Sequence, residues 1–128
     1  MRKLTNLILG FLLISLYSCS GSDTYRGLWK AIDEKGEKFE ITFNEKDISI
    51  KYMSTGRLIT YKYTQNSVSI QNSVETYGIK TGDGKTYQIN FPIANDETKG
   101  VIKNGAGTPL YIIGRSAYLK YEDIYGVK

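Results

Sequence analysis

Residues 38–52 read KFEITFNEKDISIKY, and this stretch decides the fold class. Its apolar residues fall on every second position, first from Phe39 to Phe43 and again from Ile48 to Tyr52. A period of two is typical of an antiparallel strand with one buried and one solvated face. The short polar segment between the two runs has the composition of a turn. We therefore predict a β-hairpin here.

The same alternation continues toward the C-terminus, interrupted by turn signals at close spacing. Asp83-Gly84 between two alternating runs is a strong hairpin signal. Residues 65–67, Gln-Asn-Ser, are polar and predict another turn. The further strands that we expect cover residues 58–63, 68–71, 75–80, 85–91, 100–103 and 110–114.

The C-terminal tail allows two interpretations. Residues 116–122 fit a last strand, with alternate positions from Ala117 to Tyr121 on one face. They also fit a short helix, because Tyr118, Tyr121 and Tyr125 recur at spacings of three and four. We favour the strand, since every preceding segment has the period of a strand.

These segments together predict an all-β fold, an antiparallel meander of about eight to ten strands. Open sheet edges invite aggregation, so a meander of this length must close on itself or cover its edges. We expect it to close into a small barrel.

The N-terminus has the layout of an export signal. Arg2 and Lys3 precede a mostly apolar run over residues 4–16, which is shorter than the roughly 20 residues that a membrane helix needs. The run ends at Leu16-Tyr17-Ser18-Cys19, which resembles the lipobox of bacterial lipoproteins. That resemblance implies cleavage before Cys19 and attachment of lipid to its sulfur. The alternative is an ordinary secreted protein in which Cys19 is incidental.

This interpretation divides the chain into three parts: a signal peptide over residues 1–18, a lipidated flexible tether over 19–24, and one β-barrel domain over 25–128. Cys19 is the only cysteine in the chain, so it cannot form an internal disulfide. Ser20 follows it, where an Asp would suggest retention in the inner membrane. We therefore expect an envelope protein anchored in the outer membrane, with the leaflet left open.

The composition argues against several classes of function. Removing Arg2 and Lys3 from the 17 basic residues leaves 15 against 13 acidic residues, which is too little positive charge to predict a nucleic-acid partner. The chain has no histidine, so the commonest general base and zinc ligand are missing. We expect no catalytic residues, no metal site and no cofactor.

The start of the domain carries a second resemblance. Gly27-Leu28-Trp29 looks like the Gly-x-Trp signature that opens the first strand of lipocalins and their relatives, the calycins. In that family the Trp closes one end of the barrel, and an Arg from the last strands packs across it while donating to backbone carbonyls. The resemblance assigns this role to Arg115. The alternative is that Trp29 is simply a core aromatic residue.

Tyrosines provide the remaining candidates for binding. They alternate with aliphatic residues along the strands, so some fill the core and any surplus forms a contact surface for a hydrophobic ligand, a glycan or a protein. The candidate contact residues are Tyr52, Tyr61, Tyr63, Tyr77 and Tyr87.

The leading hypothesis is a lipid-anchored, non-catalytic module that binds a small apolar ligand or an envelope partner. The alternatives are an envelope inhibitor or immunity protein acting on a hydrolase or toxin, and a structural component of an envelope assembly. A ligand-binding barrel should enclose at least about 300 Å³. The sequence leaves the oligomeric state open.

Overall fold

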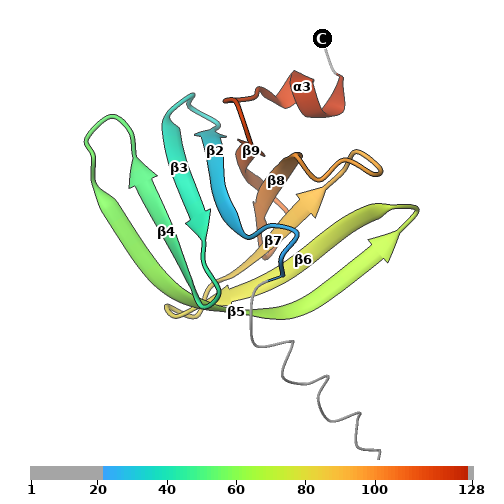
Figure 1. The fold of residues 1–128 in the computed structure, drawn as a ribbon, viewed down its shortest axis with the longest axis horizontal. Helices are drawn as coiled ribbons and strands as arrows, with labels where there is room; N and C mark the ends of the chain where they lie inside the picture. Colours follow the sequence, from blue (N-terminus) through green and yellow to red (C-terminus); the bar gives the residue numbers. More distant parts are fainter. Residues whose placement is uncertain (1–21, 127–128) are drawn as a thin grey trace, which may run out of the picture.

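The computed structural model describes residues 22–126, and this part of the chain forms one closed antiparallel barrel followed by a short helix (Figure 1). The strands are β2 (Gly27–Asp33), β3 (Lys38–Phe43), β4 (Asp47–Tyr52), β5 (Leu58–Gln71), β6 (Val74–Thr81), β7 (Thr86–Phe91), β8 (Lys99–Asn104) and β9 (Pro109–Gly114), and the helix is α3 (Tyr121–Tyr125).

Each strand pairs with its neighbours in sequence, and β9 returns to pair with β2. The closing register runs from Lys30 opposite Gly114 to Asp33 opposite Tyr111. The predicted all-β meander that closes into a small barrel is thus confirmed. Closure leaves each sheet edge covered except where a strand outruns its partner.

Aromatic and branched side chains fill the barrel interior. Phe39, Ile41 and Phe43 point inward from β3 and are each exposed by 3 % or less, as their alternation predicts. Trp29 and Ile89 are fully buried in the same cluster. Burial of a large apolar side chain contributes roughly 1.5–3 kcal/mol, so this cluster is the main source of stability.

The predicted turn at residues 65–67 is wrong. β5 runs without a break from Leu58 to Gln71, and its pairing with β6 shifts register between Gln65 and Ser67. The shift is a β-bulge. It is accommodated because Gly78 on β6 has no side chain, and a Cβ there would come within 2.8 Å of the Asn66 side-chain oxygen.

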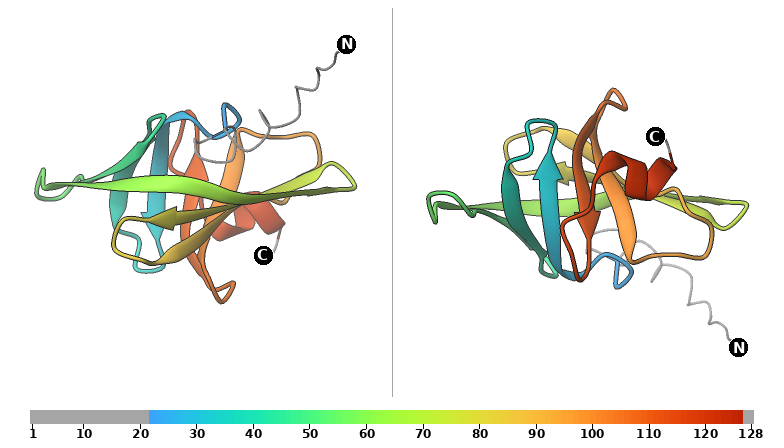
Figure 2. Two further views of the ribbon diagram at one scale, coloured as in Figure 1. Left: turned by 90° about the horizontal axis from the view of Figure 1, so that it is seen from below. Right: turned by 90° about the horizontal axis from the view of Figure 1, so that it is seen from above.

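Beyond the bulge, β5 continues past the end of β4 and pairs only with β6, whereas β6 also pairs with β7 as far as Glu75. Figure 2 shows β5 crossing the whole width of the molecule, with the tip of the hairpin projecting beyond the other strands. Asn72 and Ser73 at the tip both have positive φ, 53° and 64°, as a two-residue type I′ turn requires.

The favoured C-terminal strand over residues 116–122 is also wrong. β9 already has β8 on one side and β2 on the other, so the closed barrel offers no edge for another strand. The tail instead crosses the outer face and ends in α3. Leu119 and Ile124 cover Val101 and Ile112 there, which forms a second apolar cluster outside the barrel.

The predicted signal peptide over 1–18 and the lipidation residue Cys19 lie outside the described residues, as does the first half of the predicted tether, residues 19–21. Within residues 22–126, no helix is long and apolar enough to cross a membrane.

Candidate contact surface at the open end of the barrel

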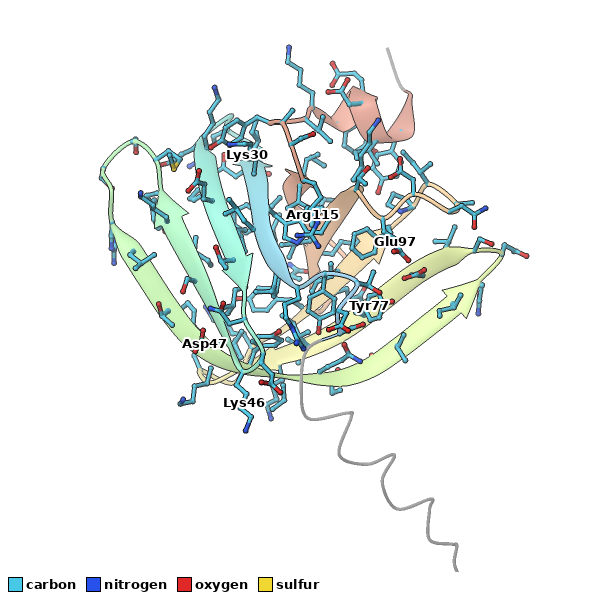
Figure 3. All side chains as sticks on the ribbon, viewed as in Figure 1. Lys30, Lys46, Asp47, Tyr77, Glu97 and Arg115 are labelled. Carbon is cyan, nitrogen blue, oxygen red and sulfur yellow. The ribbon has the colours of Figure 1, made fainter. Side chains whose placement is uncertain are left out.

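One end of the barrel is closed by Trp29 and Arg115. The guanidinium carbon of Arg115 lies 3.8 Å from the centroid of the Trp29 ring, and the indole N–H donates to the Tyr25 carbonyl at 2.9 Å. Arg115 donates to three backbone carbonyls, those of Leu28 at 3.1 Å, Arg26 at 2.8 Å and Thr24 at 3.2 Å. Figure 3 shows Arg115 beside β2.

The strand pairing explains why an arginine is needed here. β9 pairs with β2 only from Lys30 onward, so the carbonyls before Lys30 have no strand partner on that side. The guanidinium, with five donors in a planar fork, can reach several of them while its face covers the indole. Gly27 makes room for it, because a Cβ at Gly27 would lie 3.2 Å from a guanidinium nitrogen. Partial burial lowers the pKa of Arg115.

Two of the five candidate tyrosines belong to this closed end. Tyr63 and Tyr77 are buried, and both pack against Tyr25, which is fully buried. The Tyr63 hydroxyl donates to the Asn44 carbonyl at 2.6 Å, and that of Tyr77 to Glu75 at 2.6 Å. Burial is the main reason that the pKa of each is raised. Both side chains therefore serve the core.

The other three candidates, Tyr52, Tyr61 and Tyr87, lie partly exposed at the edge of the core together with Tyr111. The register places Tyr111 opposite Asp33, four residues further along β2 than Trp29. This is the open end of the barrel. Burial, followed by the nearby Tyr52 and Asp33, raises the pKa of Tyr111 to about 12.

The cavity inside this end is small. It measures about 90 Å³, which is well below the roughly 300 Å³ at the lower end for ligand pockets. Its lining includes Tyr61, Tyr87 and Tyr111 with aliphatic residues of the core. The interior is therefore nearly filled, with space for one small apolar group at the mouth.

A larger groove lies just outside the same end, and we call it the rim groove. It has a volume of about 640 Å³ between the β2–β3 turn, β9 and the C-terminal tail. Its apolar lining comprises Ile32, Pro109, Leu110, Tyr111, Ile112, Leu119 and Tyr121, and its charged lining comprises Asp33, Glu34, Lys38, Lys120 and Glu122. Leu110 and Tyr111 line the interior cavity as well, so the two spaces adjoin.

Cation–π contacts hold the tail in place beside the groove. The ammonium groups of Lys30 and Lys38 lie 5.2 and 5.0 Å from the centroid of the Tyr118 ring. Such contacts contribute about 0.5–1 kcal/mol each at exposed sites. Tyr118 thus fixes the segment that precedes α3 against the outer face of β2 and β3.

Sequence reasoning missed the rim groove because it assigned the tail to a strand. It also missed Tyr111, since the segment 110–114 is apolar throughout and predicts complete burial. The alternation along β2 was enough to predict Ile32 as part of the outer face, because its neighbour in sequence, Ala31, points into the core.

The described residues include no group of three or more His, Cys, Asp or Glu side chains that could hold a metal ion. Comparison of the chain with protein-family models, curated proteins and solved structures gave no match. The fold and the site geometry are therefore the basis for the functional proposal.

Proposed function

We propose that this chain is a lipid-anchored, non-catalytic binding protein of the cell envelope with a lipocalin-like barrel. The rim groove and the adjoining tyrosines are its contact surface for an apolar segment of an envelope partner. The observation that carries this proposal is the contrast between an interior cavity of about 90 Å³ and an outer groove of about 640 Å³. Of these two spaces, only the groove lies within the size range of binding pockets.

The chemistry of the groove fits such a segment. Ile32, Leu110 and Ile112 provide an apolar floor, while lysine and carboxylate side chains surround it. An apolar centre inside a polar rim is the usual anatomy of a protein contact surface. The tyrosine rings beside it add rigid contact area at low entropic cost.

The predicted anchor favours the same face. Ser22 is only three residues after Cys19, a span of about 10 Å at most. The Thr24 carbonyl accepts a hydrogen bond from Arg115 at the closed end of the barrel. Lipid on Cys19 would therefore hold the closed end near the bilayer and leave the open end accessible. This orientation suits an outer-membrane protein that recognises a partner in the envelope.

Site-specific photo-crosslinking in cells tests the proposal. A crosslinking residue in place of Tyr121, which is 48 % exposed in the groove, should give one discrete protein adduct. The same residue in place of Leu58, 62 % exposed and outside the groove, is the matched control. Leu110→Asp should abolish the adduct at position 121. Equal adducts at both positions, or none, would contradict the proposal.

The identity of the adduct decides between the remaining roles. A hydrolase or toxin would make the chain an inhibitor or immunity protein, and a component of membrane machinery would make it part of an assembly. Native mass spectrometry of the purified full-length chain addresses the small-ligand alternative. A stoichiometric lipid other than the anchor would favour that alternative.

A further inference from the structure

The projecting part of the β5–β6 hairpin leaves one strand edge open. β4 pairs with β5 only from Leu58 to Lys62, and the last backbone bond on that side joins the Tyr63 amide to the Lys46 carbonyl. β6 covers the opposite side as far as Gln71. Among residues 22–126, no other strand pairs with the outer edge of β5 beyond the bulge, from Ser67 to Gln71.

This edge lacks the usual defences against pairing. Proteins protect open edges with charged side chains or proline, yet residues 64–74 contain no Asp, Glu, Lys, Arg or Pro. Val68 and Ile70 are 53 % and 62 % exposed on one face of β5. The start of β2 also lacks a strand partner on one side. There, however, Arg115 donates hydrogen bonds to the carbonyls that β9 does not reach.

We propose that the edge Ser67–Gln71 pairs antiparallel with the same edge of a second copy of this chain. A two-fold axis through Ser69 would place Val68 opposite Ile70 of the second copy and Ser67 opposite Gln71. Apolar side chains then meet apolar ones on one face, and polar side chains meet polar ones on the other. The edge is thus complementary to itself, as a two-fold interface requires.

The predicted anchor favours this partner over a soluble peptide. The tether leaves the domain close to β5, since the Tyr25 hydroxyl donates to the Gln65 side chain at 2.8 Å. Two copies anchored through Cys19 share one membrane surface, which raises their effective concentration and limits their relative orientation. The type I′ turn preorganises the hairpin, which lowers the entropy that is lost on pairing.

Disulfide trapping of the full-length chain tests the proposal. Residues opposite each other in an antiparallel pair have Cα atoms about 4.5–5.5 Å apart, which is within the range for a disulfide. Ser69→Cys should therefore give a covalent dimer on mild oxidation. Thr60→Cys is the matched control. Thr60 is an exposed residue of the same strand, but at this position β4 already pairs with the outer edge of β5.

A second variant shows whether the trapped species depends on the edge. Val68→Lys with Ile70→Lys, added to Ser69→Cys, should abolish the dimer, because like charges would then face each other across the axis. Circular dichroism checks that each variant is folded. In sedimentation velocity, the unmodified chain in detergent should behave as a dimer and the double lysine variant as a monomer.

Three results would overturn the proposal. They are equal disulfide trapping at positions 60 and 69, a Ser69→Cys dimer that persists in the folded double lysine variant, and sedimentation of the unmodified chain as a monomer or as a continuous range of larger species. The last of these would identify the edge as a site of aggregation.

Discussion

At the scale of single residues, Arg115 completes the barrel where the pairing between β9 and β2 stops. It bonds three carbonyls that β9 cannot reach and covers the only Trp of the chain. The resemblance to the Gly-x-Trp signature predicts that an arginine, Arg115, packs across Trp29. The structure places Arg115 against both Gly27 and Trp29. A lysine could not replace this arginine, because one ammonium cannot bond three carbonyls while lying flat on an indole.

Arg115→Lys should accordingly lower the free energy of unfolding by about 1–2 kcal/mol, since two charge-assisted hydrogen bonds and the stacking contact are lost. Arg57→Lys is the control, because Arg57 is exposed and its guanidinium carbon lies 5.6 Å from the centroid of the Tyr52 ring. Urea unfolding followed by the fluorescence of Trp29 measures both. Equal effects of the two substitutions would contradict this account.

At the scale of elements, the strands with strict alternation were predictable and the two errors share one cause. β3, β4 and the hairpin around Asp83-Gly84 follow local signals. The bulge in β5 depends on Gly78, a residue of the neighbouring strand, and the path of the tail depends on both edges of β9 being occupied. Both conditions depend on residues far away in the sequence, so the local sequence pattern could not predict the bulge or the path of the tail.

The tail also gives a prediction at this scale. A Cβ at Gly114 would lie 2.6 Å from the Ala117 carbonyl oxygen and 2.8 Å from a Leu119 methyl carbon. Gly114→Ala should therefore push the tail outward and weaken the cluster beneath α3. We expect the free energy of unfolding to fall by about 1–3 kcal/mol. Leu119 lines the rim groove, so partner crosslinking from position 121 should fall as well.

Gly82→Ala provides the comparison for this substitution, because a Cβ there has no neighbour closer than 3.6 Å. We expect Gly82→Ala to change the free energy of unfolding by no more than about 0.5 kcal/mol. Thermal unfolding and amide exchange of residues 117–125 distinguish the two variants. Unchanged exchange in the tail of Gly114→Ala would show that the tail does not rest on Gly114.

At the scale of the whole molecule, the tyrosines connect the fold to the candidate site. Tyr63 and Tyr77 fill the closed end, whereas Tyr52, Tyr61 and Tyr87 stand at the open end. Alternation placed all five on the same strand faces as aliphatic residues, but it could not show which of them fill the core or at which level of the barrel each one lies. That level depends on the stagger between strands, which is set only when the barrel closes.

The buried hydroxyls make the whole barrel sensitive to high pH. Burial is the first cause that raises the pKa of Tyr25, Tyr63, Tyr77, Tyr87 and Tyr111, and Tyr111 rises from 10.0 to about 12. The unfolded chain therefore releases phenolic protons at a lower pH than the folded one. This contribution to stability is fully present below pH 10, and it is lost as the pH rises through the folded-state values.

We accordingly expect the free energy of unfolding to fall steadily between pH 10 and about pH 12, the window set by Tyr111. Phenolate absorbance gives the measurement, with the urea-unfolded chain at the same pH as its reference. The folded chain should develop the full phenolate signal only together with the loss of its circular dichroism spectrum. Titration of all the tyrosines with a midpoint near pH 10, the ordinary value, with the spectrum intact would mean that solvent reaches these hydroxyls. The barrel would then be open enough to admit a ligand, and the rim groove would no longer be the favoured contact surface.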